Sequence, residues 1–222
     1  MMTKEHIPPI LITGVERSGS TLIARILDMC GVWSGYCNRM YENKRLQTIY
    51  PVMTDFLFPK TEMVLPFGFK EMVADVLEKE GHKGQKWMVK GSKITQYWPL
   101  WNFIYPDAKW VLIRRRTGDV IQSCIKTGYM RTFKDKENLT ALGFEKEEDG
   151  WLWWVHQYEK KFVEMTQSGL NCRIIWPDRM AIGDFEQIKE TLDWLEVNWN
   201  NKIPEVILPL LEKGRRMEQC QE

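Results

Sequence analysis

The sequence predicts an α/β protein with a parallel central sheet flanked by helices. Short apolar segments rich in β-branched residues alternate along the chain with segments whose apolar residues recur at helical spacing. The composition, 44% hydrophobic and 27% charged, is that of a folded globular protein rather than a disordered one. Because the 222 residues contain no internal repeat and no linker, we expect a single domain over residues 1–222.

The first strand and the first helix are predicted to follow one another directly. The segment PILITG (9–14) is short, apolar and β-branched, and it closes on a glycine, as a buried central strand should. From Gly19 to Cys30 the apolar residues recur at helical spacing, with Arg25 and Asp28 on the opposite face. The chain therefore begins with a strand, a turn and a helix.

The later elements alternate in the same way. Asp184 and Gln187 stand in capping-box spacing, so we expect them to open the last of these helices. Residues 31–66 mix polar and aromatic side chains without a regular period, and we expect a substrate to be met there. In chain order the assignments are a strand at 86–91, a short proline-interrupted helix at 95–108, a strand at 109–114, a helix at 119–128, a long helix at 150–169, a strand at 172–176 and a helix at 184–195.

Charge and cysteine content argue against several classes of protein. A net charge of +1 gives no general attraction for nucleic acid or for an anionic membrane surface. Five cysteines without a CxxC pair argue against a disulfide framework and against a zinc site. The N-terminal apolar run is too short for a signal peptide, and no apolar stretch approaches the roughly 18 residues of a membrane span. We therefore expect a cytoplasmic protein.

The turn after the first strand, GVERSGST (14–21), has nearly the pattern of a phosphate-binding loop. Gly14 and Gly19 have the spacing of a Walker A motif, and Ser20 and Thr21 supply hydroxyl groups. A glycine-rich turn between a strand and a helix directs backbone N–H groups at an anion, which indicates a P-loop-like nucleotide-binding architecture. The lysine that reaches the β- and γ-phosphates of a triphosphate is missing, and the basic residue of the loop is Arg17 instead. This arrangement favours a more compact group carried on a 5′-phosphate.

A second stretch, LIRRRTGDVIQS (112–123), also leaves a strand with arginines and enters a helix. Arg115 at the strand exit and Ser123 in the helix are placed to bind one phosphate from two sides. Two anion sites on one sheet indicate a nucleotide phosphorylated at two places. Two other functions stay open: a P-loop kinase or hydrolase, for which Asp178 would serve as a Walker B acid, and a nucleotide-binding module without catalysis.

Both stretches resemble motifs of the sulfotransferases that use 3′-phosphoadenosine 5′-phosphosulfate (PAPS), and the pattern is closer to the broad bacterial and phage-like group than to the cytosolic animal enzymes. The resemblance extends over most of the chain except about residues 31–85, and it implies PAPS as co-substrate without a metal. Thr117 departs from the family's usual proline, which loosens the turn but removes no ligand. The resemblance assigns Arg17 as the catalytic basic residue, Ser18, Gly19, Ser20 and Thr21 to the 5′ group, and Arg115, Asp119 and Ser123 to the 3′-phosphate motif.

The catalytic base is where the sequence departs from the family pattern. The cytosolic enzymes have Lys-Thr-His at the end of the corresponding strand, whereas Lys90 is followed by Gly91 and Ser92. Golgi-type members use a glutamate some twenty residues after the loop, and Glu42 is the analogue here, offset by about three positions; an ordinary solvated glutamate and a base at His82 stay open as alternatives. We expect Lys90 to touch the sulfuryl group.

The acceptor and the C-terminal segment are less well defined by the sequence. The acceptor is expected to be a hydroxyl or amine of a small molecule or a carbohydrate, and its identity does not follow from the residues. The segment EKGRRM (212–217) resembles the family's loop over the 3′-phosphate, and it also fits a cationic helix end that suits the helix dipole.

Overall fold

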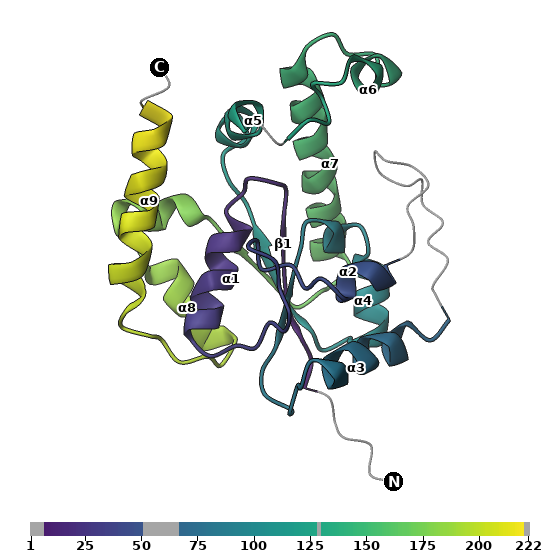
Figure 1. Ribbon diagram of the computed structural model, residues 1–222, viewed down its shortest axis with the longest axis vertical. Helices are drawn as coiled ribbons and strands as arrows, with labels where there is room; N and C mark the ends of the chain where they lie inside the picture. The colour runs from purple at the N-terminus through teal and green to yellow at the C-terminus, as the bar shows by residue number, and fades with distance from the viewer. Residues whose placement is uncertain (1–6, 51–66, 128–129, 220–222) are drawn as a thin grey trace.

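The computed structural model describes residues 7–50, 67–127 and 130–219, and side chains up to residue 212. Within this part of the chain a four-stranded parallel sheet has the order β2-β1-β3-β4 (Figure 1). Its strands are β1 (Ile10–Gly14), β2 (Met88–Lys90), β3 (Lys109–Ile113) and β4 (Cys172–Ile175). Each strand lies inside a segment that the sequence predicted, and the α/β fold class is confirmed.

Helices cover both faces of this sheet (Figure 1). They are α1 (Ser20–Met29), α2 (Leu46–Ile49), α3 (Phe69–Lys79), α4 (Trp98–Ile104), α5 (Thr117–Lys126), α6 (Lys136–Ala141), α7 (Glu147–Gln167), α8 (Glu186–Trp194) and α9 (Ile203–Gln219), with short 3₁₀ turns η1 (Lys93–Thr95) and η2 (Pro177–Ile182). Among the described residues no helix has the length and apolarity needed to cross a membrane.

The strands divide the core into two layers because successive side chains point to opposite faces. Leu11 and Trp110 face the layer formed by α3, α4, α5 and α7. Ile12 and Val111 face the opposite layer, formed by α1, α8 and α9. All four side chains are fully buried, so the central strands β1 and β3 are held from both sides. This rigid pair carries the loops that follow it.

The carboxyl ends of β1, β2 and β3 lie at the same edge of the sheet. Ile12 pairs with Lys90, and Gly14 pairs with Ile113, so the strands end close together. The segments that leave these ends are the glycine-rich loop, the Gly91–Ser92 turn and the arginine-rich stretch. In open parallel sheets this edge is where ligands bind.

The predicted capping box at the start of α8 is wrong. Asp184 Oδ1 accepts a hydrogen bond from Glu186 N at 3.1 Å, but Gln187 does not return to Asp184. Gln187 instead accepts from Trp176 N at 2.9 Å and donates to Ile174 O at 3.3 Å. Its amide group satisfies the backbone where β4 ends, which ties the helix to the sheet.

Three helices lie in segments without a prediction: α2, α3 and α6. The helix end proposed at 212–217 belongs to α9, which begins earlier, at Ile203. Phe69, Val73, Val76 and Leu77 of α3 have helical spacing and are buried. The unassigned segment 31–66 begins with an irregular stretch that includes a bridge between Cys37 and Asn43, followed by α2. Residues 51–66 lie outside the described part of the chain.

Candidate active site

The loop between β1 and α1 has a backbone that few sequences tolerate. A side chain at Gly14 would lie 2.7 Å from the carbonyl oxygen of Ile113 on the next strand, so the close approach of the two strands requires glycine. Gly19 has φ +97°, and Arg17 has φ +65°, which is uncommon for a residue with a side chain. Strained backbone of this kind is concentrated at functional sites. The first turn of α1 carries no acidic residue, so its positive end is open to an anion.

Arg17 connects this loop to the arginine-rich stretch. Its Nε donates a hydrogen bond to Ser123 Oγ at 3.0 Å, and its carbonyl oxygen accepts from a terminal nitrogen of Arg115 at 3.4 Å. The two predicted anion-binding segments are therefore in contact, whereas the sequence suggested two separate sites. Arg115 also forms an ion pair with Asp178, Nε–Oδ1 3.3 Å. The carboxylate suggested as a Walker B acid thus has an arginine as its partner.

A cleft of about 600 Å³ opens over these residues. Four arginines and two aspartates line it, so its net charge is positive. The remaining wall is largely apolar. The charged residues are Arg17, Arg25, Arg115, Arg116, Asp119 and Asp178, and the apolar residues are Leu22, Pro177, Ala181, Ile182, Leu210 and Leu211. The cleft suits a ligand that combines anionic groups with an apolar part.

Two other predicted residues, Glu42 and Lys90, form an ion pair at the end of β2. Lys90 Nζ lies 3.3 Å from Glu42 Oε1, and only 5% of the Lys90 side chain is exposed. Glu42 Oε2 accepts hydrogen bonds from Asn38 and Gln47, each at 3.1 Å. Burial raises the pKa of Glu42, but the charge of Lys90 and these hydrogen bonds outweigh it, so the pKa lies below its ordinary value of 4.5.

A smaller pocket of about 120 Å³ adjoins this ion pair. Its lining is mostly polar and comes from the segment around α2 and from the exit of β2. The lining residues are Glu42, Asn43, Leu46, Gln47, Tyr50, Val89, Lys90, Gly91, Ser92, Lys93 and Ile94. Glu42 therefore faces a pocket and is not an ordinary solvated glutamate.

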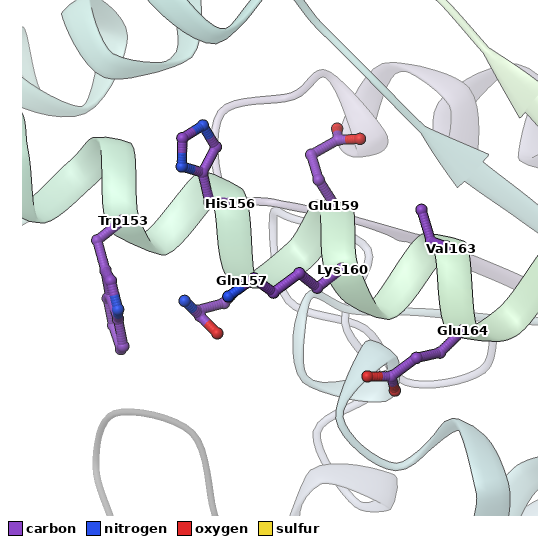
Figure 2. Close-up of a pocket in the computed structure, with 7 residues that line it drawn as sticks. All are labelled: Trp153, His156, Gln157, Glu159, Lys160, Val163 and Glu164. Atoms are coloured by element: carbon purple, nitrogen blue, oxygen red, sulfur yellow. The ribbon is translucent and has the colours of Figure 1, made fainter.

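The histidines lie away from this arrangement. A ring nitrogen of His82, Nε2, is 2.8 Å from Gln85 O, and the ring packs against Trp33 and Trp87, so His82 has a structural setting. His156 lies in a surface depression whose lining residues all belong to α7 (Figure 2). His6 lies outside the described residues. Of the two candidate bases, Glu42 and His82, it is Glu42 that is paired with Lys90.

Sequence reasoning missed Glu16, the neighbour of Arg17 in the loop. Glu16 Oε2 accepts a hydrogen bond from Trp154 Nε1 at 2.7 Å, and Tyr158 donates to Oε1 at 3.5 Å. Burial, and then the charge of Glu16, raise the pKa of Tyr158 well above its ordinary value. The acid was visible in the motif, but its partners lie about 140 residues later, which no local pattern reveals.

The C-terminal segment 212–217 is part of α9. Its side chains from residue 213 onward lie outside the described part of the chain, so a contact with a 3′-phosphate stays a prediction.

Comparison with known proteins shows which solved structures have a similar fold. No protein-family model matches the chain, and no curated protein sequence matches it significantly. The structure is similar to the sulfotransferase STF9 from Mycobacterium avium, with a TM-score of 0.58 and 10% identity over 89% of this chain. The chain spans 66% of the length of that protein. The sulfotransferase STF1 from Mycobacterium tuberculosis H37Rv matches at 12% identity over 94% of this chain and 76% of the other, with a TM-score of 0.48. The likeness to STF9 shows that this chain shares the α/β fold of that protein.

Proposed function

We propose that the protein is a sulfotransferase that transfers the sulfuryl group of PAPS to a hydroxyl or amine acceptor. The observation that carries the proposal is the contact between the two anion-binding segments, Arg17 Nε to Ser123 Oγ at 3.0 Å. A nucleotide with phosphates at its 5′ and 3′ positions needs cationic and hydroxyl groups from two neighbouring segments. The sulfotransferase-like fold supports the same reading.

A buried polar atom of the cleft fits such a donor. The Ser18 side chain is fully buried, and its hydroxyl has no hydrogen-bond partner within the described residues. An unpaired buried hydroxyl is costly, so we expect it to meet a ligand. We assign Arg17, Ser18, Gly19, Ser20 and Thr21 to the 5′-phosphosulfate, and Arg115 with Ser123 to the 3′-phosphate.

The proposed reaction is an in-line displacement at sulfur. An acceptor oxygen or nitrogen forms a bond to sulfur while the bond from sulfur to the bridging oxygen of the 5′-phosphate breaks. The electron pair of that bond stays on the leaving phosphate, where Arg17 stabilises the growing charge. Glu42 takes the acceptor proton, and Lys90 neutralises the sulfuryl oxygens. Positioning and charge stabilisation supply the catalysis, as in phosphoryl transfer through a loose transition state.

The small pocket beside Glu42 and Lys90 is the proposed acceptor site. Its polar lining suits a hydroxyl or amine group of a small molecule or a carbohydrate. The balance of 31 basic and 30 acidic side chains offers no field for nucleic acid or for a membrane surface, so we do not propose either as a partner.

Transfer of labelled sulfate tests the function directly. The protein is incubated with PAPS carrying radioactive sulfur and with pools of carbohydrates, phenols and amines, and the products are separated by chromatography. We expect label in one acceptor pool without added metal. Labelled phosphate transfer from ATP with Mg²⁺, in place of sulfuryl transfer, would establish the kinase alternative. Donor binding without transfer to any pool would favour a nucleotide-binding module.

A further inference from the structure

The segment that carries Glu42 is an irregular loop over residues 34–45, which we call the Glu42 loop. Cys37 and Asn43 form an antiparallel bridge across it. Asn38 N donates to Glu42 O at 2.9 Å, and Lys44 N donates to Tyr36 O at 3.0 Å. These bonds close the loop on itself, but they do not fix its position against the sheet. That position requires contacts with another element.

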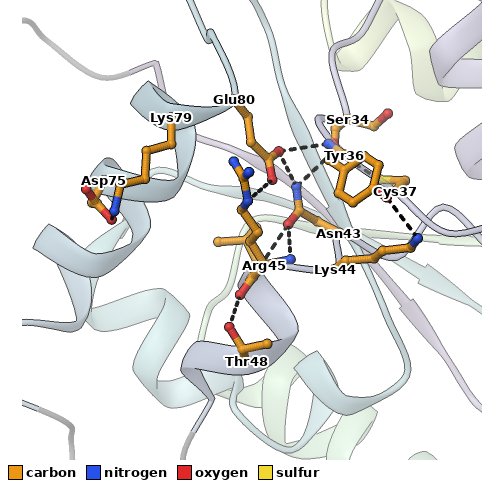
Figure 3. Close-up of polar contacts among 11 residues, drawn as sticks. Ser34, Tyr36, Cys37, Asn43, Lys44, Arg45, Thr48, Asp75, Lys79 and Glu80 are labelled. Carbon is orange, nitrogen blue, oxygen red and sulfur yellow. Dashed lines mark hydrogen bonds and ion pairs between the residues drawn. The ribbon is translucent and has the colours of Figure 1, made fainter.

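A buried carboxylate at the C-terminal end of α3 supplies contacts to both ends of the loop (Figure 3). The middle of the loop contacts α1 through the hydrogen bond from Tyr41 Oη to Asp28 Oδ2 at 3.2 Å, and β2 through the ion pair of Glu42 with Lys90. Glu80, at the C-terminal end of α3, has a side chain that is only 3% exposed. Its Oε2 accepts hydrogen bonds from Tyr36 N at 2.8 Å and from Asn43 Nδ2 at 2.7 Å. These two donors stand at opposite ends of the Glu42 loop, so one oxygen atom holds both of its ends.

The close approach of the loop to Glu80 depends on Gly35. Gly35 has φ +70°, and a side chain there would collide with the Glu80 carboxylate and with the Asn43 amide. Asn43 in turn accepts hydrogen bonds at Oδ1 from Arg45 N at 3.0 Å and from Leu46 N at 2.9 Å, which fixes the start of α2. The contacts of Glu80 therefore extend through Asn43 to the wall of the small pocket that lies around α2.

We propose that Glu80 is the positioning residue that holds the Glu42 loop, and with it the Glu42 carboxylate, against Lys90. The catalytic part of this inference rests on the proposed function, whereas the anchoring of the loop does not. Glu80 acts through the loop and does not itself line the pocket.

Glu80 could act through its hydrogen-bond acceptor or through its negative charge, and the contacts distinguish the two. Both hydrogen bonds fall on Oε2, and an amide oxygen also has two lone pairs with which to accept them. The other oxygen, Oε1, lies 3.9 Å from Arg45 Nε, and 52% of the Arg45 side chain is exposed, so this ion pair contributes little. The hydrogen-bond acceptor is therefore essential, and the negative charge is dispensable.

The test compares Glu80→Ala with Glu80→Gln, and uses Glu78→Ala as a matched control because Glu78 is an exposed glutamate on the same helix. Amide hydrogen exchange at Tyr36 and Glu42 reports the anchoring, and turnover at saturating PAPS with the donor dissociation constant reports the catalytic effect. We expect Glu80→Ala to accelerate exchange at both amides about tenfold or more. Turnover should fall by a similar factor, while donor affinity changes less than about twofold. Glu80→Gln and Glu78→Ala should stay near the unmodified protein in every measurement.

A second variant covers the case in which Glu80→Ala does not fold. Asn43→Asp keeps the oxygen that caps α2 but turns an oxygen toward Glu80 in place of the amide donor, so it should show the same losses.

Unchanged exchange in Glu80→Ala or in Asn43→Asp overturns the anchoring. Equal losses in Glu80→Gln and Glu80→Ala overturn the role of the single acceptor oxygen. Faster exchange with unchanged turnover overturns the positioning role. If the unmodified protein transfers no sulfuryl group, the proposed function fails, and hydrogen exchange alone decides the anchoring.

Discussion

Arg17 Nε donates a hydrogen bond to Ser123 Oγ at 3.0 Å, which joins the glycine-rich loop to α5 across 106 residues of sequence. This bond orients the guanidinium group of Arg17, a residue whose backbone lies in the left-handed region. An arginine held in this way is pre-organised, so little reorganisation is needed when charge develops beside it. The relationship leads to the first prediction.

Arg17→Ala should lower turnover far more than it lowers donor affinity, because the charge that Arg17 stabilises grows in the transition state. One charge-assisted hydrogen bond contributes roughly 1.5–3 kcal/mol, which corresponds to about 10- to 150-fold in rate. Turnover at saturating PAPS and the dissociation constant of the donor measure the two effects. Arg179→Ala is the matched control, since Arg179 lies in η2, pairs with Asp184 and does not line the cleft. Wild-type turnover in Arg17→Ala would exclude a catalytic role.

Glu42→Gln should lower turnover by about 100-fold or more, because it keeps the shape of the side chain and removes its basicity. The pKa of Glu42 is lowered, so the carboxylate stays ionised at pH values above 4.5 and activity should decline only as the pH falls below that value. A pH–rate profile of both proteins measures this. Retained turnover with an unchanged acid limb in Glu42→Gln would assign the base to another group.

Lys90→Met should move the acid limb of the pH–rate profile to higher pH. Burial raises the pKa of Glu42, and the charge of Lys90 is the largest effect that lowers it. Without that charge the burial effect remains, so the pKa must rise. Lys93→Met is the control, because Lys93 lines the same pocket from an exposed position. An acid limb that stays in place in Lys90→Met would show that the ion pair does not set the pKa of Glu42.

Glu16→Ala should destabilise the protein by about 1–3 kcal/mol, because it removes a carboxylate that accepts hydrogen bonds from the Trp154 indole N–H and from the Tyr158 hydroxyl. Glu16→Gln should cost less, since an amide oxygen can accept the indole hydrogen bond. Urea unfolding measures both values. Glu148→Ala, on an exposed position of α7, should stay within about 0.5 kcal/mol of the unmodified protein. A similarly small change in Glu16→Ala would mean that this link does not hold the loop.

The sequence predicted the central strands of the sheet well because they are buried from both sides. Leu11, Ile12, Trp110 and Val111 are fully buried, and such strands read as continuous apolar segments. The glycine-rich loop could also be predicted, since both of its glycines are required by the backbone and stand in a recognisable spacing. Gly14 allows the approach of β3, and Gly19 adopts a positive φ.

The contacts that complete the candidate site could not be predicted from the sequence in the same way. Glu80 and Asn43 are 37 residues apart, and Glu16 and Trp154 are 138 residues apart. Each pair depends on which faces of α3 and α7 meet the loops, and that is decided by tertiary packing. The predicted capping box was wrong for the same reason, because Gln187 bonds to the backbone of Ile174 and Trp176 at the end of β4, which local spacing cannot show.

The last prediction concerns the 3′-phosphate, which separates a PAPS enzyme from ordinary nucleotide-binding proteins. AMP lacks a phosphate there, and 3′,5′-adenosine bisphosphate carries one. Two charge-assisted contacts, from Arg115 and Ser123, at about 1.5 kcal/mol each correspond to a preference of roughly 100-fold for the bisphosphate. Calorimetric titration with both nucleotides measures this preference, and equal affinities in the unmodified protein would contradict the PAPS assignment.

Variants show whether Arg115 is the source of that preference. Arg115 is ion-paired to Asp178 and donates to Arg17 O, so its guanidinium group is oriented at the cleft from two sides. Arg115→Ala should reduce the preference to less than about tenfold while AMP affinity changes little, because AMP makes no contact at the 3′ position. Arg179→Ala is the matched control: it removes an arginine from η2 that is paired with Asp184 and does not line the cleft. If Arg115→Ala kept the full preference, or if Arg179→Ala lost as much of it, the 3′-phosphate would have to be bound elsewhere.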